Sequence, residues 1–220
     1  MGAASPPCRR PTLGPPMDAT VMSDADLRDQ LRQLVLARGY ERRSEPFALS
    51  AGGMSNDYVD MRRAVARGAD LRIAALAVAD ALARRGVEFD AIGGMTMGAD
   101  PVAHAVALLT DRAWYSVRKA VKEHGRRQRI EGMPVGPGVR VVVIDDTVST
   151  GKSLFDAFEV VRDCGAEVVA ACTLLDRGEL VAPRFRSLGV EYVAVLTYRD
   201  LGIEPIGTDG NGPAAGPVAP

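Results

Sequence analysis

The chain has 220 residues, of which 47% are hydrophobic and 25% charged, and its formal net charge is -1 at pH 7. This composition is ordinary for a globular protein, and the length suits one α/β domain with a full core. A net charge near zero excludes a global field that would draw the protein to nucleic acid or to an anionic membrane. No apolar run approaches membrane-spanning length, and no secretory signal is expected.

The three cysteines, Cys8, Cys164 and Cys172, do not have the spacing of a metal site. Their number is odd, and the last two fall in predicted core elements. These features favour a reducing compartment, so we expect a cytoplasmic protein.

Both ends of the chain are rich in Pro, Gly and Ala and have no hydrophobic periodicity. We therefore predict a disordered extension over residues 1–22 and a disordered tail over residues 205–220. Residues 23–204 are expected to form a single domain. Its first helix is predicted over Asp24–Arg38, with Ser23 as the N-cap.

The segment from Phe47 to Arg62 has the pattern of a strand, a glycine turn and a second strand. It precedes the alternation of helices and strands, so we predict a small hood at about residues 40–65 beside the main sheet. Asp60 and Arg62 have a simpler explanation than a functional role, which is that they lie on a solvated strand face.

A helix is predicted over Ala69–Arg85, followed by a strand, a glycine turn and a helix from Asp90 onward. Gly93, Gly94 and Gly98 are predicted to let backbone amides approach a ligand closely. A tight connection between strand and helix explains the same glycines.

A strongly basic segment, about residues 118–132, follows a predicted strand over Trp114–Val117. Long loops in compact domains are usually lids or binding loops. We predict a mobile lid that brings cations and His124 to a polyanion, although a solvated hairpin has the same pattern. Binding of nucleic acid is disfavoured because no aromatic residues lie among the cations.

The most informative stretch is Val139–Ser153, in which a β-branched strand over Arg140–Ile144 leads into Asp145 and Asp146. A small turn rich in hydroxyl groups and a predicted helix follow. The N–H groups of such a turn and helix start can hold a phosphate. The acids are placed to bind ribose hydroxyls or a hydrated cation. The purely structural alternative is that the two acids only cap the helix.

The rest of the chain continues the alternation of strands and helices, which predicts a parallel sheet with right-handed crossovers. Ligands of such sheets bind at the carboxyl ends of the strands. The polar residues that we place at these ends are Thr96, Arg118, Asp145 and Arg177.

Taken together, these stretches resemble the orotate phosphoribosyltransferases, a type I phosphoribosyltransferase family. The hairpin, the Gly-Gly-x-Thr-x-Gly-Ala-Asp-Pro turn, the basic loop and the Asp-Asp-x-x-x-Thr-Gly motif occur in family order over roughly Asp24 to Pro205. The resemblance implies an α/β fold with a central, mainly parallel sheet flanked by helices, and a small N-terminal hood containing a β-hairpin.

The resemblance also implies a reaction. Orotate and phosphoribosyl pyrophosphate would give orotidine 5′-monophosphate and pyrophosphate, in the synthesis of UMP. Mg²⁺ is the implied cofactor, held mainly through substrate and water rather than by a protein metal site. The implied assembly is a homodimer in which lid residues are shared across the interface.

Residue roles follow from the resemblance by position. Lys122, His124, Asp145 and Asp146 are the implied catalytic residues, and Ser149 and Arg177 the implied orotate contacts. The residues implied to bind phosphoribosyl pyrophosphate are Arg118, Lys119, Lys122, His124, Asp145, Asp146, Thr147, Val148, Ser149, Thr150, Gly151, Lys152 and Ser153.

This chain departs from the family pattern at several positions. Arg43 stands where many relatives have a lysine, and Thr96 and Met97 replace a Tyr-Lys pair in the glycine turn. Lys152 is an additional cation beside the phosphate turn. Two alternatives stay open: a phosphoribosyltransferase for another nucleobase, and a non-catalytic sensor of phosphoribosyl pyrophosphate.

Overall fold

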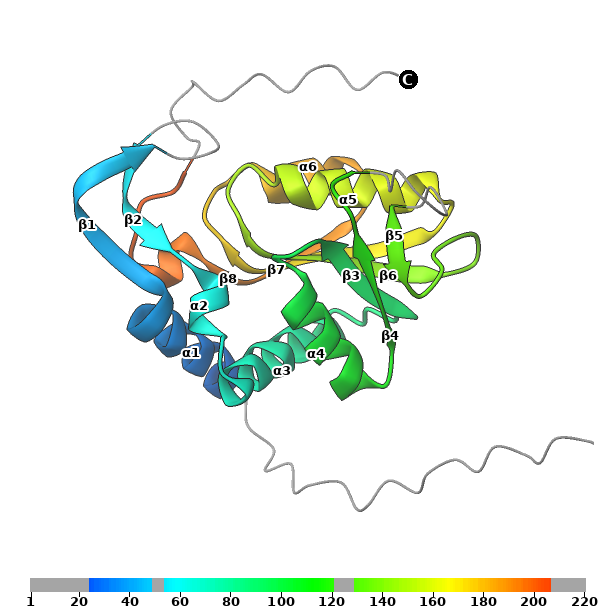
Figure 1. Cartoon of the computed structure of the whole chain (residues 1–220), viewed down its shortest axis with the longest axis horizontal. Helices are drawn as coiled ribbons and strands as arrows, with labels where there is room; N and C mark the ends of the chain where they lie inside the picture. The colour runs from blue at the N-terminus through cyan, green and yellow to red at the C-terminus, as the bar shows by residue number, and fades with distance from the viewer. Residues whose placement is uncertain (1–23, 49–53, 121–128, 207–220) are drawn as a thin grey trace, which may run out of the picture.

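The computed structural model describes residues 24–48, 54–120 and 129–206. A central sheet has helices on both faces, and a separate β-hairpin stands at one end (Figure 1). The sheet order is β5-β4-β3-β6-β7-β8, and every neighbouring pair is parallel except β4 and β5. The strands are β3 (Ala91–Met95), β4 (Ala113–Val117), β5 (Ile130–Gly132), β6 (Arg140–Val148), β7 (Glu167–Asp176) and β8 (Glu191–Thr197). The predicted α/β class and mainly parallel sheet are confirmed.

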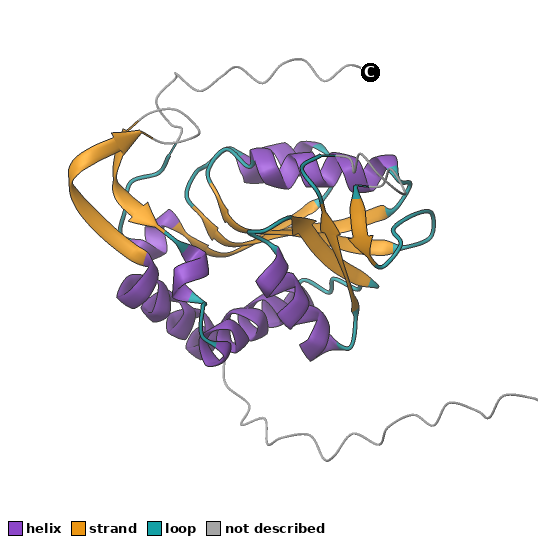
Figure 2. Cartoon of the chain, in the orientation of Figure 1, coloured by secondary structure: helices purple, strands orange, loops and turns teal. Residues whose placement is uncertain are grey.

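The helices form two layers, as Figure 2 shows. One layer packs on one face of the sheet and contains α1 (Asp24–Leu34), α3 (Gly68–Arg84) and α4 (Asp100–Thr110). The other face is covered by α5 (Lys152–Asp163) and α6 (Val181–Ser187). A π-helical turn over Val35–Gly39 extends α1, and a 3₁₀ turn over Tyr198–Leu201 follows β8.

Strand β6 lies between these layers and contributes to both cores. Val142 and Ile144 pack in the cluster with α1, α3 and α4, whereas Val141 and Val143 pack in the cluster with α5 and α6. All four side chains are fully buried. The alternation follows from the two-residue period of a strand, and burial on both faces explains the continuous apolar run in the sequence.

The hood contains the predicted hairpin, whose turn at residues 49–53 lies outside the described residues. The two strands pair antiparallel, with an irregularity between Arg42 and Phe47. They are β1 (Tyr40–Ala48) and β2 (Met54–Val59), and the helical turn α2 (Met61–Ala64) follows them.

Asp60 and Arg62 do not lie on a strand face. The Asp60 carboxylate accepts a hydrogen bond from the Arg63 N–H at 3.2 Å and caps α2. The N–H of Asp60 donates to the Gly39 carbonyl at 2.8 Å, which holds the hood against the end of the first helical segment. The prediction of a strand here is therefore wrong, because the cap starts a helical turn.

The central strand is longer than predicted. β6 continues through Asp145 and Asp146, since it remains paired with β7 as far as Val148 and Asp176. The prediction that the strand ends before the acids is wrong. The consequence is that the carboxylates are fixed by a sheet ladder instead of standing on a free turn.

Two of the predicted ligand-facing glycines have a packing role. A β-carbon on Gly93 would lie 2.0 Å from the Tyr115 carbonyl oxygen, and one on Gly94 would lie 1.9 Å from the Ile144 carbonyl oxygen. Both glycines lie inside β3 and let neighbouring backbone approach. The ligand-facing prediction is wrong for these two, whereas Gly98 lies in the turn after β3.

Candidate active site

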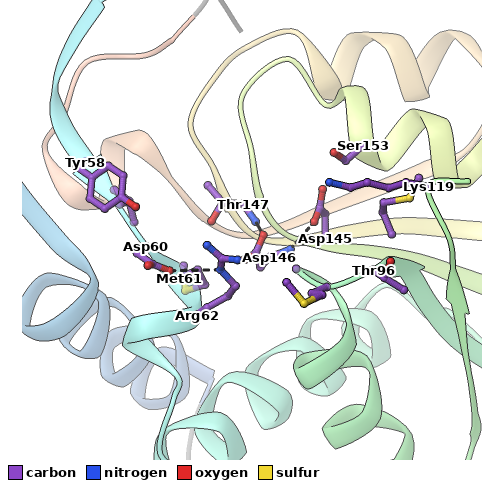
Figure 3. Close-up of a pocket in the computed structure, with 14 residues that line it drawn as sticks. Tyr58, Asp60, Met61, Arg62, Thr96, Lys119, Asp145, Asp146, Thr147 and Ser153 are labelled. Atoms are coloured by element: carbon purple, nitrogen blue, oxygen red, sulfur yellow. Dashed lines mark hydrogen bonds and ion pairs between the residues drawn. The ribbon is translucent and has the colours of Figure 1, made fainter. Parts of the chain in front are cut away.

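A cavity of about 510 Å³ opens at the carboxyl ends of β3 and β6, where the hood faces the sheet (Figure 3). This is the edge at which open α/β sheets bind ligands. Its walls come from the hood, from the turn after β3, and from the end of β6 with the start of α5. In sequence these are residues 58–62, 95–98, 119, 145–147 and 153.

The carboxylate pair forms the floor of this cavity. Oδ1 of Asp145 accepts the Asp146 N–H at 3.0 Å, and Oδ1 of Asp146 accepts the Thr147 N–H at 2.7 Å. Burial raises the pKa of Asp145 to about 7, and the charge of Asp146 adds to the rise. Burial also raises the pKa of Asp146. Ligand groups that favour the charged form, such as ribose hydroxyls and cations, are therefore well matched to this pair.

The turn after β3 lies directly against these acids. A β-carbon on Gly98 would be 3.0 Å from Oδ1 of Asp146 and 3.3 Å from Oδ1 of Asp145. Thr96 lies in the same turn and lines the cavity, with its N–H donating to the Val117 carbonyl at 2.9 Å. The glycine thus allows the turn and the acids to form one continuous wall.

Lys119 and Arg62 bring positive charge to the cavity from different walls. Lys119 extends toward Asp145 and Ser153, and Arg62 extends from α2 toward Asp146 (Figure 3). The charge of Lys119 opposes the rise in the pKa of Asp145, and that of Arg62 opposes the rise in the pKa of Asp146. The cavity therefore combines two adjacent carboxylates with cations from two different walls.

The end of β6 and the turn that leads into α5 have two features expected of a phosphate site. Gly151 has a left-handed backbone, with φ at 74°, and begins α5. The hydroxyl oxygen of Thr147 is buried and has no hydrogen-bond partner in the part of the chain that the structure describes. A buried polar atom without a partner is costly, so this hydroxyl is a candidate contact for a ligand.

The other predicted turn residues divide into two groups. Ser149 and Thr150 are half-buried in the turn, and Val148 is buried. Lys152 does not line the cavity and forms an exposed ion pair with Asp156 at 2.6 Å. Its predicted contact with phosphate stays a prediction.

Arg177 is buried directly after β7, and only 5% of it is exposed. Its Nε and Nη2 atoms are buried without a hydrogen-bond partner among the described residues. Burial lowers the pKa of Arg177, while the charge of Asp57 and the phenol of Tyr40 in the hood oppose this change. A guanidinium with unpaired buried nitrogens is a receptor for a planar carboxylate.

The backbone around Arg177 is held on three sides. Its N–H donates to the Val148 carbonyl at 2.8 Å, and its carbonyl accepts the Ile206 N–H at 2.7 Å. The buried carboxylate of Asp176 accepts the Gly178 N–H at 2.9 Å and the Tyr192 hydroxyl at 2.8 Å. Ile206 is itself buried, so ordered structure continues past the expected domain end at residue 204.

The predicted lid is only partly described. Lys122 and His124 lie outside the described residues, and the end of the segment forms β5 instead of a loop. Arg118 does not line the cavity but lies 3.4 Å from Glu131 on that strand. The last residues of the segment, Ile130–Gly132, therefore belong to the sheet, and the role of the segment as a lid stays a prediction.

Arg43 is part of the hood surface. Its guanidinium lies 4.7 Å from the ring centre of Phe47 and 4.6 Å from that of Tyr58. The structure thus places Arg43 on aromatic rings, outside the residues that line the cavity.

Sequence reasoning did not select two cavity residues, Asp60 and Arg62. The strand–turn–strand pattern of the segment suggested a solvated strand face, whereas Asp60 caps a helical turn through a local hydrogen bond from the Arg63 N–H. The available signal was Asp60 itself, because Asp is a favoured N-cap residue.

Comparisons with known proteins agree with this geometry. Residues 75–186 match the phosphoribosyl transferase domain family. The orotate phosphoribosyltransferase of Streptomyces coelicolor is 41% identical over 71% of this chain and 87% of that protein. That of Corynebacterium glutamicum (strain R) is 34% identical over 83% of this chain and 96% of that protein.

Solved structures give the same result. The crystal structure of Mycobacterium tuberculosis orotate phosphoribosyltransferase with Fe(III) dicitrate has a TM-score of 0.68 and 34% identity, covering 80% of this chain and 99% of that one. The same enzyme in complex with 5-phospho-α-D-ribosyl 1-diphosphate has a TM-score of 0.64 and 32% identity over the same shares. Fold and site define a type I phosphoribosyltransferase. At this identity and coverage, the chain belongs to the orotate phosphoribosyltransferase family.

Among the described residues, no group of three or more His, Cys, Asp and Glu side chains is placed to hold a metal ion. No helix in the described ranges is long and apolar enough to cross a membrane.

The raised pKa of Asp145 gives a prediction for stability. Since the folded pKa of about 7 exceeds the ordinary value of 3.8, this group makes the free energy of unfolding fall as pH rises between these values. We expect Asp145→Asn to be more stable than wild type at pH 8, by on the order of 2–4 kcal/mol, with little difference at pH 4. Denaturant titrations at both pH values measure this.

Asp163→Asn is the matched control, because the Asp163 side chain is 74% exposed. It should follow the wild-type pH dependence. Equal stability of Asp145→Asn and wild type at pH 8 would contradict the assigned cost of ionising Asp145.

Proposed function

We propose that this enzyme transfers the ribose 5-phosphate group of phosphoribosyl pyrophosphate to orotate, giving orotidine 5′-monophosphate and pyrophosphate. The observation that carries the proposal is the buried guanidinium of Arg177, which has two unpaired nitrogens at the same sheet edge as the carboxylate pair. Orotate has a carboxylate that fits this group, whereas hypoxanthine, guanine and uracil have none.

During the reaction, the sugar and the leaving group develop opposite charges. Pyrophosphate leaves the anomeric carbon, so positive charge develops on the sugar and negative charge on the leaving group. Asp145 and Asp146 hold the ribose and face the positive charge, while Lys119 lies where it can stabilise an anion. Catalysis by this chain is therefore mainly electrostatic and positional.

Mg²⁺ fits this site as a substrate-bound ion. The cavity has two adjacent carboxylates but, in the described ranges, too few clustered ligands for a protein-only site. Mg²⁺ commonly keeps several waters and binds substrate phosphates. When bound, it would neutralise charge on the diphosphate, and this chain would contact it mainly through substrate oxygens and water.

The basic segment after β4 supports the role of a lid in this proposal. Arg118 and Lys119 lead into it, and Lys122 and His124 would complete the set of cations at the diphosphate. Lid closure would exclude water and prevent hydrolysis of the activated sugar. His124 would act as a proton shuttle or as a further positive charge.

A homodimer is supported by an apolar surface on α4 and β4. Leu108 is 84% exposed and Trp114 41% exposed, and the Trp114 ring lies 4.4 Å from that of His104. β4 leads directly into the basic segment that contains the proposed lid residues. This arrangement fits the proposed sharing of lid residues.

The chain is proposed to act in UMP biosynthesis in the cytoplasm. The cysteines of the described ranges, Cys164 and Cys172, are free thiols, which suits a reducing compartment.

The first test follows the fall in orotate absorbance with phosphoribosyl pyrophosphate and Mg²⁺, with hypoxanthine, guanine and uracil as competing bases. We expect turnover of orotate alone. Arg177→Met should lower kcat/KM for orotate by about a hundredfold, because it removes a charge-assisted pair of hydrogen bonds. Ligand-free Arg177→Met should be at least as stable as wild type, since no unpaired buried cation remains.

Arg184→Met is a suitable control. Arg184 lies on α6, with its guanidinium 3.7 Å from the centre of the Phe155 ring of α5, and it does not line the cavity. Preference of the wild type for a purine, or unchanged orotate efficiency in Arg177→Met, would contradict the proposal.

The dimer surface gives a separate prediction. Leu108→Glu should convert the dimer into a monomer in analytical ultracentrifugation, because it places a charge in a buried apolar contact. Leu188→Glu, at an exposed leucine beside α6, should leave the dimer intact. A monomeric wild type, or a Leu108→Glu variant that still dimerises, would refute this surface.

A further inference from the structure

Arg62 stands on a rigid platform at the hood wall of the cavity. Met61 and Ala64 of the same helical turn are buried, with 1% and 0% of their surfaces exposed. Asp60 caps the turn, and its own N–H is tied to Gly39. The backbone position of Arg62 is therefore fixed before any ligand arrives.

The guanidinium of Arg62 is available for a ligand. Its side chain is 56% exposed, and its Nε atom lies 3.6 Å from Oδ1 of Asp60, which is longer than a hydrogen bond. Asp60 already accepts the N–H of Arg63. The planar fork of donors on Arg62 is thus directed into the cavity, on the side of Asp146 (Figure 3).

The position of Arg62 selects one part of the proposed substrate. In the proposed function, the turn that begins α5 binds the 5′-phosphate, and Arg177 binds the carboxylate of the base. Neither Arg177 nor Gly151 lines the cavity, whereas Arg62, Lys119 and Gly98 do. The remaining group of the substrate, the diphosphate, is the polyanion that this part of the cavity suits.

We infer that Arg62 binds the diphosphate of phosphoribosyl pyrophosphate from the hood side, opposite Lys119. The inference rests on the proposed function and adds a binding residue to it. The hood thereby becomes one half of a cationic clamp, and its capped helical turn sets where the diphosphate lies. Arg62 acts by binding and orientation of the leaving group.

A binding experiment separates this contact from catalysis. Isothermal titration calorimetry would compare phosphoribosyl pyrophosphate with Mg²⁺ against ribose 5-phosphate, which has no diphosphate. We expect Arg62→Ala to weaken binding of phosphoribosyl pyrophosphate by about tenfold or more, and binding of ribose 5-phosphate by less than about twofold. Arg62→Lys should recover part of the loss.

Arg63→Ala is the matched control, because Arg63 is exposed on the same helical turn and does not line the cavity. It should bind both ligands as wild type does. Equal Kd values for Arg62→Ala and Arg63→Ala, or an equal loss for both ligands in Arg62→Ala, would overturn the inference. A wild type that binds no phosphoribosyl pyrophosphate would overturn the proposed function as well.

Discussion

The candidate site is organised by two adjacent carboxylates at the end of the central strand, of which Asp145 is buried and Asp146 is half-buried. Asp145 and Asp146 are kept in place by the ladder between β6 and β7, and a glycine turn lies against them. Burial makes their ionisation costly in the ligand-free protein. In the proposed function, hydrogen bonds from the ribose hydroxyls to the ionised pair would offset part of this cost when the substrate binds.

Arg177 follows the same principle with the opposite charge. Its guanidinium is buried with two unpaired nitrogens, while its backbone is held by β6, by Asp176 and by Ile206. A rigid backbone with an unsatisfied charge is preorganised for a partner of complementary shape. In the proposed function, the acid pair faces the sugar of the substrate and Arg177 faces the carboxylate of the base.

The sequence predicted the class of fold and most elements, because strand and helix periodicities agree with the tertiary packing. Val141 to Ile144 alternate between two cores, and the buried strand was evident as a continuous apolar run. Two features were missed. The sheet ladder extends β6 through the acids, and the capped turn at Asp60 directs Arg62 into the cavity. Neither is encoded in local periodicity.

Proton linkage tests the central claim about the acid pair most directly. Binding of phosphoribosyl pyrophosphate with Mg²⁺ would be measured by calorimetry at pH 6.5 in buffers of different ionisation enthalpy, for wild type and Asp145→Asn. Protons released by the ligand are common to both proteins. The difference in proton release between them therefore reports the change in protonation of Asp145 on binding. The account predicts that wild type releases more protons than the variant, because binding favours the ionised carboxylate. Equal proton release from the two proteins would contradict it.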